Sequence, residues 1–251
     1  GIDSSLVACI AVEAVGKENA TGIFMPSVYT SRESTEDAKA LAENLGIRFL
    51  TLPIDDIFGS CRKGLKDAFT GLKEDTTEEN IQARIRGNLL MAFSNKFGHL
   101  VLATGNKTEL ALGYCTLYGD MSGGLSIIGD VSKMQVYELA RYYNETKGAA
   151  IPERVFERAP SAELREGQRD PFDYSVVSPM VDLIVEERKS RKDLLCLGYN
   201  SELVDDILER IHRNEYKRRQ AAPIIKVTKK AFGTGRRYPI ANQFTSKSEI
   251  C

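Results

Sequence analysis

The sequence predicts an α/β protein built on a parallel sheet. Three short apolar stretches have the character of buried strands: ATGIFMPS (20–27), IRFLTLPI (47–54) and LVLATGN (100–106). Segments with helical spacing of apolar residues alternate with them, which is typical of βαβ units. Right-handed crossovers then place helices on both faces of the sheet. We therefore expect a parallel sheet covered on both faces, followed by a mainly helical C-terminal part.

Apolar residues recur at helical spacing in several further segments. These are residues 4–15, 34–45, about 57–69, about 78–97, 136–143 and 203–211. Gly46 is the expected stop signal of the second helix. Between the last two helices, RAPSAELREGQRDPFDYS (158–175) is polar and long enough for an active-site loop. The tail KKAFGTGRRYPIANQF (229–244) is basic and irregular.

The bulk composition excludes several classes of partner. A net charge of -1 gives no reason to expect nucleic acid or an anionic membrane surface. No apolar run approaches the roughly 20 residues that span a bilayer. Two histidines are too few for a His-rich metal centre. We therefore expect a cytoplasmic protein that acts on small molecules.

The cysteines are scattered, odd in number and never in a C-x-x-C pair. This argues against a zinc site or a disulfide framework and favours a reducing compartment. We expect them to be buried or incidental. They are Cys9, Cys61, Cys115, Cys196 and Cys251.

The opening segment GIDSS (1–5) places small and polar residues before the first helix. In parallel sheets, ligands bind beyond the carboxyl ends of the strands, and a helix N-terminus attracts anions. Ser4 and Ser5 add hydroxyl donors. Asp3 would repel a phosphate unless a cation stood between them, so it suggests Mg²⁺. Taken alone, the segment is better explained by Asp3 or Ser4 acting as a helix cap.

A second polar site comes at the end of the third strand, in TGNKTEL (104–110). Thr104 ends the strand, and Glu109 lies in the first turn of the next segment. If the strand ends are neighbours, Glu109 could share a hard cation with Asp3. The alternative is a solvated glutamate that interacts favourably with the helix dipole.

The segment NIQARIRGNLL (80–90) carries two arginines on different parts of one helix surface. Arg84 or Arg86 could bind an anionic substrate group while the other holds a structural ion pair. Ordinary surface arginines are the alternative for both.

Several separated motifs together resemble NAD⁺ synthetase, a ligase of the N-type ATP pyrophosphatase family. GIDSS looks like the second half of an S-G-G-x-D-S pyrophosphate loop. Further motifs then occur in the family's order and spacing, nearly end to end. They are NIQARIR, TGNKTELALGYCTLYGDMSGG, SIIGDVSKMQVYELARY, RAPSAELR, NEYKRRQ and AFGTGRR. The resemblance implies one Rossmann-like, adenine nucleotide alpha-hydrolase-like domain over residues 1–251.

The resemblance also implies a reaction. The carboxylate of deamido-NAD (nicotinic acid adenine dinucleotide) attacks the α-phosphorus of ATP, and pyrophosphate leaves. Ammonia then displaces AMP from the acyl adenylate to give NAD⁺. Mg²⁺ is the expected cofactor, and positioning and electrostatics are the expected source of catalysis.

The family's functional residues match eleven positions of this sequence. The resemblance implies ATP binding by Gly1, Ser4, Ser5, Thr104, Lys133 and Ser161; metal binding by Asp3 and Glu109; catalysis by Asp3, Lys133 and Ser161; and dinucleotide binding by Arg84, Tyr216 and Lys217. Tyr216 stands where ammonia-dependent relatives carry His. Leu117 replaces a lysine of those relatives, and Gly124 replaces an acid. These departures favour the glutamine-dependent branch.

Three expectations concern the surroundings of the domain. The glutamine-dependent branch implies an upstream glutaminase domain and a first strand that precede Gly1. The family's usual acidic segment is absent between Asp170 and Pro171, which favours a mobile loop whose residues are missing from the sequence at this point. The family also implies a homodimer or a larger homo-oligomer.

Two other functions share some of these features. A GMP synthetase-like amidotransferase has the same ATP pyrophosphatase chemistry but not TLYGDMSGG and NEYKRRQ. A non-catalytic adenine-nucleotide-binding module would need neither the carboxylate pair nor the lysines of the second half.

Overall fold

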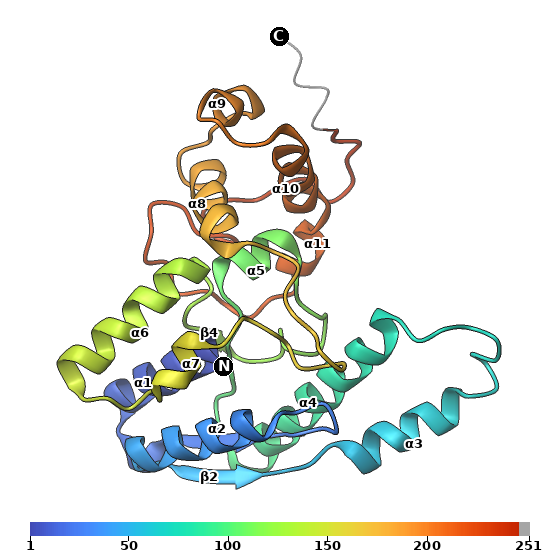
Figure 1. The fold of residues 1–251 in the computed structure, drawn as a ribbon, viewed down its shortest axis with the longest axis vertical. Coiled ribbons are helices and arrows are strands. Elements are labelled where there is room, and N and C mark those ends of the chain that lie inside the picture. Colours follow the sequence, from blue (N-terminus) through green and yellow to red (C-terminus); the bar gives the residue numbers. More distant parts are fainter. Residues whose placement is uncertain (246–251) are drawn as a thin grey trace.

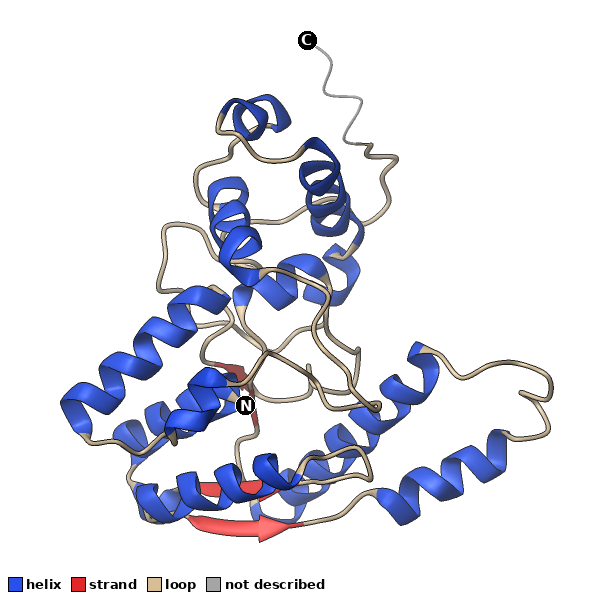
Figure 2. Cartoon of the chain, viewed as in Figure 1, coloured by secondary structure: helices blue, strands red, loops and turns tan. Residues whose placement is uncertain are grey.

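The computed structural model describes residues 1–245, and helices dominate it (Figures 1 and 2). A single 3₁₀ turn, Lys17–Asn19, comes after the first helix. The α-helices are α1 (Ile2–Val15), α2 (Arg32–Leu45), α3 (Asp55–Leu65), α4 (Thr76–Phe97), α5 (Lys107–Leu112), α6 (Lys133–Lys147), α7 (Glu153–Glu157), α8 (Tyr174–Val185), α9 (Arg191–Cys196), α10 (Ser201–Arg213) and α11 (Glu215–Arg218).

All strand pairing between named strands is parallel, as expected. β1 (Thr21–Phe24) pairs with β2 (Arg48–Thr51), and β3 (Leu102–Ala103) pairs with β4 (Leu125–Ser126). A single bridge joins Ser126 to Ile224. The expected α/β class is confirmed, but within residues 1–245 the strands form two separate pairs rather than one continuous sheet.

The strand expected over 100–106 is short because helix signals lie close on both sides of it. Gly98, in the left-handed conformation, ends α4, and Asn106 already caps α5. Helix boundaries elsewhere differ by a few residues for similar reasons. Ser31 caps α2 by accepting a hydrogen bond from the Ser34 backbone N–H at 3.1 Å, so this helix begins before residue 34. Gly46 ends it as expected.

Two large apolar cores meet near α5. One core joins α1, α2, α6 and α7, and the other joins α5, α8 and α10. Helix α5 contacts α6, α8 and α10 and lies between the C-terminal helices and the rest of the fold (Figure 1). The short helix α5 therefore sits where the two halves of the molecule join.

Among the described residues, no helix is long and apolar enough to cross a membrane. Cys9, Cys61, Cys115 and Cys196 are free thiols, while Cys251 lies outside the described residues. Burial raises the pKa of Cys9 and of Cys115 to about 12, so both thiols stay protonated at neutral pH. These two cysteines are therefore poor nucleophiles, in agreement with the sequence.

Helix α4 packs unusually closely on the loop after α5. A Cβ atom on Gly87 would lie 2.8 Å from the Tyr118 carbonyl oxygen and 2.9 Å from that of Gly119. We expect Gly87→Ala to lower the free energy of unfolding by about 1–3 kcal/mol, because backbone atoms must move to admit the methyl group. Urea denaturation measures this change.

Gly59 provides the control, because it is an exposed residue of helix α3 and a Cβ atom there would meet no other atom within 4 Å. Gly59→Ala should raise the free energy of unfolding by about 0.5–1 kcal/mol through helix propensity. Equal stabilisation by both alanines would contradict the close approach at Gly87.

Candidate active site

Three helix N-termini bring the main polar residues together. Asp3 lies in the first turn of α1, Glu109 in the first turn of α5, and Lys133 is the first residue of α6. Helix α6 contacts both α1 and α5, so residues more than 100 positions apart in the sequence become neighbours. The expected meeting of Asp3 and Glu109 is therefore seen in the structure.

Lys133 stands between the two carboxylates. Its Nζ lies 2.5 Å from Asp3 Oδ2 and 3.3 Å from Glu109 Oε1. The lysine side chain is nearly buried, at 4% exposure, while the carboxylates keep 18% and 17%. One ammonium thus bridges two acids that remain partly open to a ligand.

The charges in this cluster do not balance, and the pKa values reflect it. Burial and the nearby Asp3 raise the pKa of Glu109 to about 8, although Lys133 opposes the shift. Burial alone would lower the pKa of Lys133, but Glu109 and Asp3 raise it above its ordinary value. The ammonium therefore stays charged, and without a metal ion Glu109 is mostly protonated at neutral pH; a bound divalent cation would favour its ionised form.

Asn106 completes the cluster, although its sequence context gave no reason to expect it there. Its Nδ2 donates to Asp3 Oδ1 at 2.8 Å, and its Oδ1 accepts from the Glu109 backbone N–H at 3.0 Å. The N-x-x-E spacing of a capping box was the available signal. Such a box indicates a helix start, however, and carries no information about a distant aspartate.

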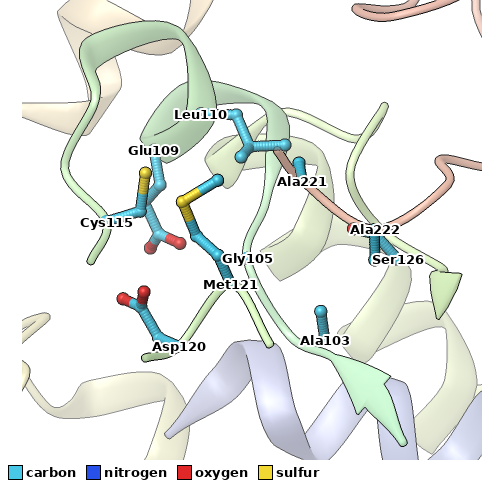
Figure 3. A pocket seen from close by; sticks show the side chains of 10 residues that line it. All are labelled: Ala103, Gly105, Glu109, Leu110, Cys115, Asp120, Met121, Ser126, Ala221 and Ala222. Atoms are coloured by element: carbon cyan, nitrogen blue, oxygen red, sulfur yellow. The ribbon is translucent and has the colours of Figure 1, made fainter. Parts of the chain in front are cut away.

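Glu109 also borders a small cavity (Figure 3). Figure 3 shows the carboxylates of Glu109 and Asp120 directed toward one another, with Cys115 and Met121 beside them. Asp120 accepts a hydrogen bond from the Thr116 backbone N–H at 2.6 Å, and desolvation raises its pKa to about 6. Asp120 was not among the expected site residues.

The two serines of GIDSS are turned toward their own helix. The Ser4 and Ser5 hydroxyls donate to the Gly1 carbonyl oxygen at 3.0 and 2.9 Å. Ser5 is buried, whereas Ser4 is exposed. A role for them as phosphate donors stays a prediction, and it requires these hydroxyls to rotate. Thr104, partly buried, lies between β3 and the cap of α5.

Ser161 lines a second, larger pocket between the start of α2 and the loop after α7. Its hydroxyl accepts from the Glu163 backbone N–H at 3.1 Å. The pocket lining includes Tyr29 and Ser31 and four arginines. Those arginines are Arg154, Arg158, Arg165 and Arg169.

The residues expected to bind the dinucleotide lie elsewhere and do not form one cluster with Asp3. Arg84 Nε donates to the Leu117 carbonyl at 3.2 Å. Lys217 Nζ donates to the carbonyls of Gly113 and Cys115, both at 2.7 Å. Tyr216 is 41% exposed. Lys217 thus holds the chain after α5, and dinucleotide binding by these three residues stays a prediction.

Arg86 is bound to the backbone of another segment, so it is not an ordinary surface arginine. Its Nε donates to the Met25 carbonyl at 2.9 Å, and burial lowers its pKa. Arg86 therefore holds the chain after β1, and Arg84 is the arginine left near the surface.

Lys107 is a buried residue that sequence reasoning missed. Its Nζ lies 2.6 Å from Glu186 Oε1, 3.2 Å from Asp182 Oδ1 and 3.6 Å from Asp130 Oδ1, and its side chain is fully buried. Lysines are almost never buried without partners. These three acids lie far from Lys107 in the sequence, so no local signal pointed to them.

Asp3 and Glu109 fit a magnesium ion. Mg²⁺ prefers oxygen ligands, and where it acts with nucleotides it takes one or two carboxylates together with phosphate oxygens and water. The donor set here is two carboxylates. Within residues 1–245, no group of three or more His, Cys, Asp or Glu side chains could hold a metal ion by itself. The cluster therefore suits a metal that arrives with a phosphate ligand.

Comparison with known proteins decides the family. The NAD synthase family model matches residues 1–221. The chain belongs to the NAD synthase family. This match excludes the alternative of a GMP synthetase-like amidotransferase.

Curated relatives of this NAD synthase family chain are longer than it is. The glutamine-dependent NAD(+) synthetases of Thermotoga maritima and of Synechocystis sp. are each 52% identical to it, and each match covers 97% of this chain. The matches cover 43% and 44% of those relatives. The chain thus spans less than half the length of these relatives.

A solved structure agrees with the sequence match. The glutamine-dependent NAD⁺ synthetase from Acinetobacter baumannii, in complex with adenosine diphosphate, is 44% identical with a TM-score of 0.63. The match covers 98% of this chain and 45% of that chain. The fold and the sequence therefore identify the same family.

Removal of the Lys133 ammonium should cost stability. Lys133→Met leaves Asp3 and Glu109 facing each other without a counter-ion, so we expect the free energy of unfolding to fall by about 2–4 kcal/mol. Lys147→Met is the control on the same helix, because Lys147 is 53% exposed and its ion pair with Glu13 is worth less than about 1 kcal/mol. Urea denaturation at neutral pH compares the two. Equal losses in both variants would mean that the bridge contributes little.

Proposed function

We propose that this chain carries out the ATP-dependent amidation of deamido-NAD to NAD⁺. The carboxylate of the nicotinic acid ring attacks the α-phosphorus of ATP, which releases pyrophosphate and forms an acyl adenylate. Ammonia then displaces AMP to form the amide. The family match supports this reaction, and the relatives named glutamine-dependent NAD(+) synthetase support the branch.

The observation that carries the proposal is the arrangement of Asp3, Glu109 and Lys133. Two partly open carboxylates and a charged lysine converge at three helix N-termini, where the helix dipoles favour an anion. A binding module for adenine alone would not need this concentration of charge. Transfer at a phosphorus atom does need it, because the transition state and the leaving pyrophosphate are strongly anionic.

Asp3 and Glu109 would hold Mg²⁺, which neutralises phosphate oxygens when it is bound. Lys133 already contacts both carboxylates and can reach toward a phosphate as a compact point charge. Ser161 and the arginines of the second pocket would bind the remaining phosphates. Gly1, Ser4, Ser5 and Thr104 are proposed to bind ATP as well. The complex of the A. baumannii relative with adenosine diphosphate supports nucleotide binding in this fold.

Arg84, Tyr216 and Lys217 are proposed to contact the dinucleotide. Arg84 and Tyr216 offer exposed polar groups near the chain after α5. Lys217 would act mainly by shaping that chain, since its ammonium donates to two backbone carbonyls.

Further proposals concern the surroundings of this chain. We expect glutamine to supply the ammonia through a glutaminase domain that precedes this one in the same polypeptide. We also expect a homodimer or larger homo-oligomer in the cytoplasm, and a loop of additional residues between Asp170 and Pro171. The relatives' lengths support the additional domain.

The nitrogen source can be tested directly. The intact polypeptide, supplied with ATP, Mg²⁺ and deamido-NAD, should form NAD⁺ and pyrophosphate in equal amounts from either glutamine or ammonium. If NAD⁺ formed from ammonium but not from glutamine, the proposed ligase reaction would stand and the proposed glutaminase domain would be contradicted. Binding of ATP without release of pyrophosphate from either donor would contradict the proposed reaction and favour a binding module.

The metal-binding carboxylates can be tested by neutral replacements of similar shape. Asp3→Asn and Glu109→Gln should each reduce kcat for NAD⁺ formation by about 100-fold or more, because each removes a charged oxygen ligand. Glu153→Gln is the control, since Glu153 is 67% exposed and pairs only weakly with Arg141 at 3.5 Å. Steady-state kinetics at saturating Mg²⁺ measure the effect. Activity within a few-fold of wild type in both site variants would rule out this metal site.

A further inference from the structure

Asn106 contacts both proposed metal-binding residues through hydrogen bonds. Its side-chain amide donates to Asp3 Oδ1 at 2.8 Å, and its side-chain carbonyl accepts from the Glu109 N–H at 3.0 Å. Its own backbone N–H donates to Glu109 Oε2 at 3.3 Å. The residue is fully buried. A small, uncharged side chain therefore connects the start of α1 with the start of α5.

Helix capping does not explain why this residue is an asparagine. A cap needs only an oxygen acceptor, which serine or aspartate supplies as well. Other helices of this chain use such residues in capping boxes, for example Asp75 at α4 and Ser190 at α9. The amide N–H₂ of Asn106 is additional to the cap, and its hydrogen-bond partner is Asp3.

The amide also suits a cation site better than a charged donor would. Asp3 receives Lys133 on Oδ2 and Asn106 on Oδ1, so both oxygens are oriented while each keeps a further lone pair. Glu109 is oriented in the same way, by Lys133 on Oε1 and the Asn106 backbone on Oε2. A second ammonium or a guanidinium at this position would compete with a metal ion, whereas a neutral amide does not.

We infer that Asn106 is a positioning residue that holds Asp3 and Glu109 in the arrangement that binds a divalent cation together with ATP. The inference rests on the proposed function, because that function assigns the two carboxylates to the metal. Asn106 acts through the two acids rather than on the metal or the substrate. Partners of this kind, one shell beyond the ligands, typically change metal affinity by 10–100-fold when they are removed.

Asn106→Ser separates positioning from capping. Serine keeps the acceptor for the Glu109 N–H but is too short to reach Asp3. We expect the variant to unfold cooperatively, like the wild type, and to bind Mn²⁺ about 10-fold more weakly. Binding is measured by electron paramagnetic resonance on the intact polypeptide, with Mn²⁺ as the probe and the non-hydrolysable α,β-methylene ATP present. This readout does not depend on turnover.

Asn200→Ser is the matched control. Asn200 caps α10 by accepting from the N–H groups of Glu202 and Leu203, on a helix that carries none of the site residues. The same substitution there should leave Mn²⁺ binding unchanged. A second test uses Asp3→Asn as the background, in which Asn106→Ser should have no further effect on Mn²⁺ affinity because the contact it removes is with Asp3.

Each outcome points to a different conclusion. Wild-type Mn²⁺ affinity in a folded Asn106→Ser protein would overturn the inference. Glycine is tolerated at helix caps, so Asn106→Gly should still fold. If both Asn106→Ser and Asn106→Gly failed to fold, Asn106 would be a purely structural cap, and the inference would be overturned as well. Absence of Mn²⁺ binding by the wild type would instead count against the proposed metal site, and hence against the proposed function.

Discussion

The first turn of α5 is the part of the molecule on which the site's arrangement depends. This helix has only six residues, and a helix of that length is not stable alone in water. Its start is therefore fixed from outside. Asn106, Lys107 and Thr108 are all fully buried, and each binds a different part of the chain. Removal of these contacts would release Glu109 from its place opposite Asp3.

The three contacts act in different directions. Asn106 connects α5 to Asp3 at the start of α1, and Lys107 connects it to the acids at the end of α8. The Thr108 hydroxyl accepts from the Lys133 backbone N–H at 3.1 Å and lies 3.1 Å from the Ser178 hydroxyl. Buried polar groups of this kind are costly unless every one is paired, and when they are paired they specify one geometry. The position of Glu109 opposite Asp3 thus depends on neighbouring buried residues to which we assign no role in the proposed reaction.

The sequence predicted the parts of the site whose signal is local. The sequence predicted that Asp3 and Glu109 could meet, and the structure brings them together through the contacts of α6 with α1 and α5. The direction of the Ser4 and Ser5 hydroxyls could not be predicted from the sequence. A serine near a helix start can donate to a backbone carbonyl of its own helix, and here both do. The burial of Lys107 could not be predicted from the sequence, because its three acidic partners come from distant segments. The short length of β3 could not be predicted either, because it depends on the helix end at Gly98 and the helix cap at Asn106.

The charges in the second pocket support the proposal that a cation binds together with ATP at the cluster of Asp3, Glu109 and Lys133. Its four arginines face three glutamates that also line the pocket, Glu33, Glu157 and Glu163. Several of the arginines are already paired, with Arg154 and Arg158 both bound to Asp37 and Arg165 near Glu79. The phosphates that we propose to bind there would therefore meet arginines whose charge is partly offset by these acids, and at the other site they would meet one lysine shared by two acids. For a divalent cation to bind Asp3 and Glu109, the Lys133 ammonium that bridges them would have to move toward the phosphates. The cation would then supply positive charge where the proposed transfer of the adenylyl group takes place.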